Sequence, residues 1–124
     1  MTLGTLPASH AVTALDGGIV LRPALPRDAR AISELVRPYS DQRILIAKDL
    51  IAYFEDVQEF TVAEEVSADT GGATDLVGCG ALHVMWDDIA EMRTLAVRRD
   101  RIHHGIGAAL LGELLERARA LGLR

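Results

Sequence analysis

Residues 91–111, which read EMRTLAVRRDRIHHGIGAALL, decide how the rest of the chain is interpreted. The start of this stretch belongs to a predicted strand over residues 90–97, and the polar residues after it predict a loop. A helix is expected to begin next to Gly105 and Gly107, because apolar residues then recur every four positions. They are Ile106, Leu110, Leu114 and Ala118, with Leu111 and Leu115 beside them. The stretch therefore predicts a strand, a glycine-containing loop and an amphipathic helix that packs on a sheet.

The start of this helix is suited to binding an anion. The first backbone N–H groups of a helix have no partner within it, and the helix dipole adds partial positive charge there. Glycine at 105 and 107 removes Cβ atoms that would obstruct a ligand, and three arginines within residues 98–101 add charge. A phosphate-bearing ligand is therefore expected. The alternative is that Gly105 and Gly107 only allow the helix to pack closely on its strand.

Two other phosphate-binding loops fit this stretch less well. A Walker A loop needs a lysine followed by serine or threonine after its glycines, and no such pair follows Gly107. A dinucleotide-binding loop needs a third small residue where Leu110 stands, and a further βαβ unit after it.

Upstream, the sequence predicts a mixed α/β (α+β) domain. Its expected elements are a strand at 19–21, a helix from 27 to about Pro38, a helix over 47–57, a strand at 60–63, a loop at 67–74 and a strand at 76–86. The order β-α-α-β-β-β-α, with two hairpins in a row, favours a mainly antiparallel sheet with flanking helices. Residues 1–18 are expected to form a flexible leader.

The composition excludes several classes of protein. A length of 124 residues suits one domain, and 13 basic against 18 acidic residues with 4% aromatic content argue against nucleic-acid binding. No apolar run approaches the ~18 residues of a membrane span. The single cysteine, Cys79, cannot form an internal disulfide, so a cytoplasmic protein is expected. Adjacent His103 and His104 diverge on a loop, so no metal site is expected.

Several motifs together resemble the GNAT superfamily of acyl-CoA-dependent N-acetyltransferases. Residues 95–97 followed by 105–107 match the family's apolar-x-Val strand end and its Gln/Arg-x-x-Gly-x-Gly/Ala loop. Residues 44–50, 57–64 and 77–82 resemble the short amino-acid N-acetyltransferases of the N-acetylglutamate synthase type that lack a kinase-like domain. The resemblance implies direct acetyl transfer, in a ternary complex, to the α-amino group of an amino acid. L-Glutamate is the substrate it implies, as in the first step of arginine biosynthesis.

The chain departs from the family pattern at two places. Ile102 stands where the loop usually has glutamine or arginine, with Arg101 one residue earlier. The chain also ends at Arg124, where the family continues into a fifth strand and a segment that carries a tyrosine for the leaving thiolate. Residues 19–124 are therefore interpreted as a partial GNAT domain whose C-terminal strands are missing.

The resemblance also implies a cofactor site for acetyl-CoA as co-substrate, without a metal. The pantetheine arm would lie along the main chain of Leu95, Ala96 and Val97. The pyrophosphate would lie against the loop and the helix start, at Ile102, His103, His104, Gly105, Ile106, Gly107 and Ala108.

Four residues are candidates for catalysis and substrate binding. Glu91 aligns with the strand glutamate that acts as general base in family members, or else is an exposed residue paired with Arg93. Arg93 shares its face and either holds a substrate carboxylate or only neutralises Glu91. Lys48 and, more weakly, Arg43 are candidates to contact a substrate carboxylate; a solvated lysine is the alternative for Lys48.

Two other functions remain open. One is a truncated, non-catalytic module that binds CoA or a protein partner, such as a second copy in a homodimer, through the open edge of the strand at 90–97. The other is a GNAT enzyme with a different amine acceptor. Neither a nucleic acid nor a membrane is an expected partner.

Overall fold

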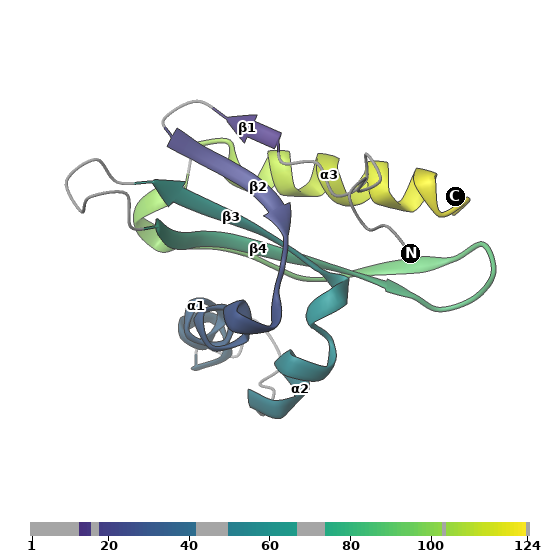
Figure 1. The fold of residues 1–124 in the computed structure, drawn as a ribbon, viewed down its shortest axis with the longest axis horizontal. Coiled ribbons are helices and arrows are strands. Elements are labelled where there is room, and N and C mark those ends of the chain that lie inside the picture. Colours follow the sequence, from purple (N-terminus) through teal and green to yellow (C-terminus); the bar gives the residue numbers. More distant parts are fainter. Residues whose placement is uncertain (1–12, 16–17, 42–49, 67–73, 103, 124) are drawn as a thin grey trace, which may run out of the picture.

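The computed structural model describes residues 13–15, 18–41, 50–66, 74–102 and 104–123. Within these ranges one antiparallel sheet has the order β1-β2-β3-β4-β5, and helices cover both of its faces (Figure 1). The strands are β1 (Thr13–Leu15), β2 (Ile19–Pro23), β3 (Phe60–Val66), β4 (Thr74–Val84) and β5 (Ala90–Val97). The helices are α1 (Ala29–Asp41), α2 (Leu50–Glu55) and α3 (Ile106–Ala120), with short 3-10 helices η3 (Pro26–Asp28), η4 (Val57–Glu59) and η6 (Arg99–Arg101).

The expected order β-α-α-β-β-β-α is confirmed from β2 onward, as is the mainly antiparallel sheet. The structure differs before β2, because Thr13–Leu15 form a strand within the stretch expected as a leader. This strand pairs with β2 through Thr13↔Leu21 and Leu15↔Ile19. Gly18, directly before β2, has a φ of 76°, which glycine adopts without the steric cost of a Cβ atom.

Helix α1 continues past the residue at which it was expected to end. Pro38 lies inside the helix, which runs on to Asp41. Proline removes one backbone hydrogen bond from a helix, but the next residue supplies a tertiary anchor. The Tyr39 hydroxyl donates to the carbonyl oxygen of Val97 on β5. Helix α2 begins at Leu50 within the described residues, and its expected last turn is instead the 3-10 helix η4.

The sheet separates two cores. Buried residues on the α1 and α2 side include Ile32, Val36, Tyr53, Phe60, Val62, Cys79, Ala81 and Ala96. The α3 side is formed mainly by Leu21, Ala63, Val77, Ile106 and Leu110, and a neighbouring cluster by Leu82, Leu114 and Leu123. The apolar stripe of α3 is narrower than expected, because Leu111 and Leu115 are exposed.

The hairpin of β4 and β5 extends beyond the helices at one end of the molecule (Figure 1). Its turn exposes apolar side chains, among them Met85, Trp86 and Ile89. Trp86 has an exposed fraction of 71%. None of the helices in the described ranges is long and apolar enough to cross a membrane.

Two glycines of β4 allow α3 to lie close to the sheet. A Cβ atom at Gly78 would lie 2.9 Å from Leu110 Cδ1 and 3.0 Å from Ile106 Cγ2. A Cβ atom at Gly80 would lie 2.9 Å from Leu114 Cδ1. All three distances are shorter than a normal contact, so the helix occupies the space that these glycines leave open.

Alanine substitutions test this packing. Gly78→Ala is expected to lower the free energy of unfolding by about 1–3 kcal/mol, because the new methyl group overfills a buried interface. The control Gly112→Ala lies on α3 with open space at its Cβ position, so it should raise stability by ~0.5–1 kcal/mol. Urea unfolding followed by circular dichroism measures both, and equal effects would contradict the packing role of Gly78.

A buried carboxylate joins β2 to the start of α1. Asp28 accepts hydrogen bonds from Arg22 at 2.7 and 3.0 Å and from the Leu25 N–H at 2.7 Å. Arg22 also donates to Glu64 of β3 at 3.0 Å. Burial by itself raises the pKa of Asp28, but the hydrogen bonds from Arg22 and Leu25 and the Arg22 charge outweigh burial. The pKa of Asp28 therefore lies below its ordinary value of 3.8.

This lowered pKa predicts a loss of stability in acid. The unfolded carboxyl titrates near pH ~3.9, so the contribution of Asp28 is complete above that pH and is lost as the pH falls through the lower folded pKa. Asp28→Asn should lower the free energy of unfolding at pH 7 by about 1–3 kcal/mol and should reduce its decrease between pH 5 and about 2. Urea midpoints across this range measure the effect, and an unchanged acid dependence in the variant would contradict it.

Candidate active site

Strand β5 carries a bulge next to the open edge of the sheet. Cys79 pairs with Ala96 and Ala81 pairs with Arg93, so two residues of β5, Thr94 and Leu95, lie opposite Gly80. Thr94 has a φ of 52°, the one positive value at a non-glycine position among the described residues. Bulges redirect the main chain of a strand and are frequent beside functional sites.

The main chain after the bulge presents polar groups to this edge. The Arg98 N–H donates to Val77 O at 2.8 Å and therefore faces β4. Main-chain groups alternate along a regular strand, so those of Val97, which follows the bulge, face away from β4. The Val97 carbonyl is met there by the Tyr39 hydroxyl.

A glycine loop leads into α3 at the position where an anion-binding loop is predicted. Gly105 precedes the helix with a φ of 78°, and the Ala109 N–H donates to Gly105 O at 3.0 Å. The N–H groups of Ile106, Gly107 and Ala108 belong to the first helical turn, which leaves them without intrahelical partners. Ile102 and His104 are exposed on the same loop, and His103 lies outside the described residues.

The two loop glycines are not explained by helix packing. A Cβ atom at Gly107 would meet only Val97 Cγ2, at an ordinary 3.7 Å, and one at Gly105 would meet nothing within 4 Å. The alternative that both glycines serve close packing is therefore wrong, because Gly78 and Gly80 of β4 serve it instead. Glycine at 105 is required by its positive φ. The packing of the described residues does not require glycine at 107.

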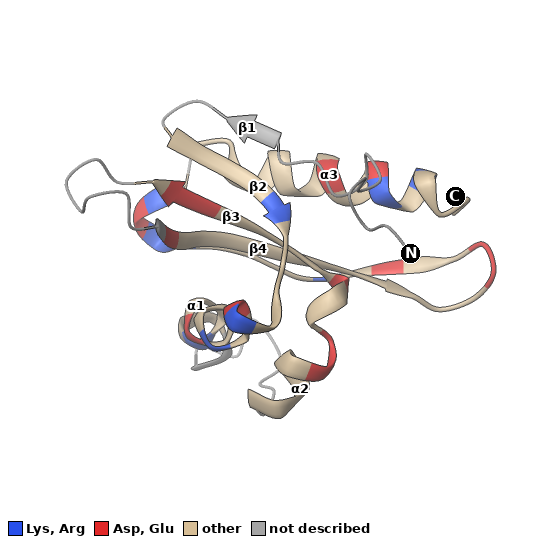
Figure 2. Cartoon of the chain, in the orientation of Figure 1, with Lys and Arg blue, Asp and Glu red and all other residues tan. Residues whose placement is uncertain are grey.

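The arginines near this loop are more strongly paired than expected. Arg101 forms two bonds with Glu65 of β3, at 2.7 and 2.8 Å, and Arg98 binds Asp100 at 2.6 Å. The hydrogen bonds that Glu65 accepts from Arg101 hold the pKa of Glu65 below its ordinary value. The guanidinium of Arg99 lies 5.3 Å from the centre of the Tyr39 ring. Figure 2 shows acidic and basic residues side by side at this end of β3. The expected excess of positive charge is thus largely neutralised by neighbouring carboxylates.

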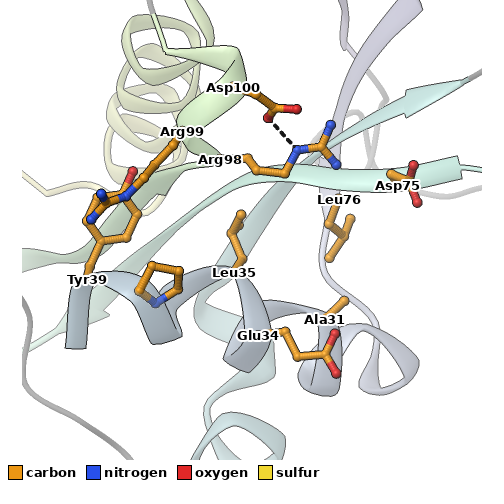
Figure 3. A pocket seen from close by; sticks show the side chains of 10 residues that line it. Ala31, Glu34, Leu35, Tyr39, Asp75, Leu76, Arg98, Arg99 and Asp100 are labelled. Carbon is orange, nitrogen blue, oxygen red and sulfur yellow. Dashed lines mark hydrogen bonds and ion pairs between the residues drawn. The ribbon is translucent and has the colours of Figure 1, made fainter. Parts of the chain in front are cut away.

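A cavity of about 590 Å³ opens between α1, the start of β4 and η6 (Figure 3). Charged groups of Glu34, Asp75 and Arg98 surround an apolar floor that includes Leu35 and Leu76. Tyr39 also lines it, so the residue that contacts the β5 main chain is one wall of this cavity. Sequence reasoning missed Tyr39, because its partner lies 58 residues away.

Glu91 and Arg93 lie together on β5, before the bulge. Arg93 Nε donates to Glu91 Oε1 at 2.8 Å, and the exposed fractions of the Arg93 and Glu91 side chains are 37% and 48%. Arg93 pairs with Ala81, whose side chain is in the core beneath α1 and α2, so both charged groups lie on that face of the sheet. The ion pair expected as one alternative is therefore present. Lys48 and Arg43 lie outside the described residues.

A second polar pair lies next to Glu91 and was missed by sequence reasoning. His83 Nδ1 is 2.7 Å from Glu59 Oε2, and His83 is the direct cross-strand partner of Glu91. We call Glu59, His83, Glu91 and Arg93 the polar strip. Across the described ranges, no group of three or more His, Cys, Asp or Glu residues is arranged to hold a metal ion.

Comparison with known proteins agrees with this arrangement. Residues 28–124 match the Acetyltransferase (GNAT) family. The chain belongs to this family. An amino-acid acetyltransferase of Mycobacterium tuberculosis is 47% identical over 105 residues, which cover 85% of this chain and 58% of that protein.

Two solved structures are similar to this GNAT chain. A Mycobacterium tuberculosis protein in complex with CoA is 46% identical with a TM-score of 0.74, over 84% of this chain and 60% of that one. The N-acetylglutamate synthase of Neisseria gonorrhoeae, in complex with coenzyme A and N-acetyl-glutamate, is 29% identical with a TM-score of 0.77. That match covers 89% of this chain and 24% of the synthase. The GNAT chain thus spans between about a quarter and three-fifths of the length of these relatives.

The different roles of the loop glycines predict different costs of substitution. Gly105→Ala should lower the free energy of unfolding by about 1–2 kcal/mol, because alanine is strained at a φ of 78°. Gly107→Ala should leave stability unchanged or raise it by up to ~1 kcal/mol, because a methyl group fits and favours the helix. Thermal unfolding distinguishes the two, and a large loss for Gly107→Ala would show that packing requires that glycine.

Proposed function

We propose that this chain forms the acetyl-CoA-binding core of an amino-acid N-acetyltransferase that acetylates the α-amino group of L-glutamate. The observation that carries the proposal is the bulged edge strand β5 leading into the open glycine loop of α3. The amino-acid acetyltransferase relative and the N-acetylglutamate synthase structure support the substrate class and glutamate, respectively. The reaction would be the first step of arginine biosynthesis in a cytoplasm that keeps the buried Cys79 reduced.

Acetyl-CoA supplies an activated acetyl thioester, and β5 and α3 have groups suited to bind it. Main-chain groups of Leu95 and Val97 would pair with the pantetheine amides, with Ala96 between them. The pyrophosphate would accept hydrogen bonds from the N–H groups at the start of α3, where Gly107 leaves room. Ile102, His103 and His104 would flank it, as would Gly105, Ile106 and Ala108. No metal takes part in this scheme.

Glu91 and Arg93 are suited to the amino-acid substrate. A substrate ammonium must lose a proton before its nitrogen can attack the thioester, and Glu91 would take that proton directly or through water. The bond from Arg93 to Glu91 uses Nε, which leaves its two terminal nitrogens to bind a substrate carboxylate. Lys48 and Arg43 would contribute further positive charge. A main-chain N–H beside the bulge would stabilise the tetrahedral oxyanion.

Acetyl transfer to a panel of amino acids tests this function. The chain is mixed with acetyl-CoA and each amino acid, and thiol release and the N-acetyl product are measured. We expect release that depends on glutamate, and Glu91→Gln should lower kcat/KM by ~10²–10⁴-fold without changing CoA affinity. Gly107→Ala should weaken CoA binding while the fold is kept.

The same panel separates the other functions. Transfer to another amine without glutamate dependence would show a GNAT enzyme with a different acceptor. CoA binding by calorimetry without transfer to any amine would show a CoA-binding module. A homodimer is a further proposal, and light scattering of the purified chain would decide it.

A further inference from the structure

His83 and Glu59 form a close pair beside the proposed general base. Their distance is 2.7 Å, and the exposed fractions of the His83 and Glu59 side chains are 35% and 25%. The imidazole is thus shielded by protein on one side and reached by water on the other. Neither residue lies on β5. His83 lies on β4 and Glu59 on η4, so two further elements contribute polar groups beside Glu91.

The strand register places this pair next to Glu91. His83 and Glu91 are direct antiparallel partners, and such partners share a face with Cβ atoms ~4.5–5.5 Å apart. Glu91 is bound on its other side by Arg93. The polar strip therefore runs from the Glu59 carboxylate of η4 to the His83 imidazole of β4, and then to Glu91 and Arg93 of β5.

The main chain that carries Glu59 is held from the opposite layer. Arg117 of α3 donates to the carbonyl oxygens of Glu59 and Gln58, both at 3.1 Å, and to Thr61 Oγ1 at 2.9 Å. The Glu59 N–H donates to Asp56 O at 2.9 Å. These bonds fix η4, so the direction in which the Glu59 carboxylate meets His83 is set before any substrate binds.

This geometry selects one tautomer of the histidine. An ionised carboxylate only accepts hydrogen bonds, so His83 Nδ1 must carry the hydrogen that Glu59 accepts. In the neutral ring the lone pair then lies on Nε2, which is the nitrogen able to take up a proton. Glu59 also stabilises the imidazolium that results. The charged groups around the ring are Glu59 of η4 together with Glu91 and Arg93 of β5, and Asp56 precedes η4.

We propose that His83, positioned by Glu59, accepts the proton that Glu91 removes from the substrate ammonium. The proposal rests on the proposed function. One N–H bond of the ammonium breaks and its electron pair stays on nitrogen as the nucleophile. The proton passes from the substrate nitrogen to Glu91 and then to His83 Nε2, and this second transfer restores Glu91 as a carboxylate. Release of the proton from the imidazolium to water restores neutral His83 for the next substrate. His83 is a relay residue and Glu59 a positioning residue.

The kinetic test uses the chain with acetyl-CoA and the amino acid it acetylates. His83→Gln should lower kcat by ~10–100-fold and leave the KM for acetyl-CoA unchanged. Glu59→Gln should lower kcat to a smaller extent, because the imidazole loses the carboxylate that orients it. Glu55→Gln, an exposed carboxylate on α2, is the matched control and should change neither.

Two further measurements separate the relay from a structural role. His83→Ala should regain rate when imidazole is added to the solution, which a merely structural defect would not allow. The ¹⁵N shifts of His83 in the unliganded chain should show hydrogen on Nδ1, and loss of this preference in Glu59→Gln.

The outcomes separate this inference from the proposed function. Transfer at an unchanged rate in His83→Gln would overturn the relay and leave the proposed function intact. Hydrogen on Nε2 of neutral His83 would overturn the relay without any assay of activity. Absence of transfer to every amino acid would overturn the proposed function, and the relay with it.

Discussion

The contact of α3 with Gly78 and Gly80 is the constraint on which the rest of the site depends. Leu110 and Leu114 occupy the space that side chains at these positions would fill. Gly80 is also the residue opposite the bulge, and a Cβ atom there would lie 3.2 Å from Leu95 Cδ1. The absence of a side chain at Gly80 therefore leaves room both for α3 and for the bulged part of β5. Because α3 lies this close, its first turn begins beside Val97, so the glycine loop lies next to β5, the edge strand of the described sheet.

Three of the arginines hold different elements together. Arg22 joins β2 to Asp28 and Glu64, Arg101 ties the loop before α3 to Glu65, and Arg117 secures η4 from the opposite layer. Each contact joins residues from different elements. Arg22 and Arg101 meet carboxylates, whereas Arg117 meets main-chain carbonyls and the Thr61 hydroxyl. In the proposed acetyl-CoA site, phosphate recognition would therefore fall mainly to main-chain N–H groups, whose positive ends need no counter-ion.

Elements whose formation depends on residues close in sequence could be predicted from local sequence patterns. The strand over residues 90–97 was predicted with the bounds observed, and the buried stripe of Ile106, Leu110 and Leu114 followed from its spacing. Contacts between distant residues were not predictable in this way. Glu65 meets Arg101, Tyr39 meets Val97 and Glu59 meets His83 only because the sheet and helices bring them together. Pro38 was taken as a helix end because its local cost is visible in the sequence, whereas the anchor at Tyr39 is not.

The exposed hairpin turn has a consequence for how this protein is observed in solution. Trp86 is the single tryptophan of the chain, and it lies at that turn, away from both cores. The fluorescence of Trp86 therefore reports the solvent exposure of this hairpin turn and is nearly insensitive to the packing of α1 or α3. Unfolding of the cores and a change in Trp86 fluorescence are therefore separate signals. Fluorescence of the buried Tyr53 is the signal that follows the core.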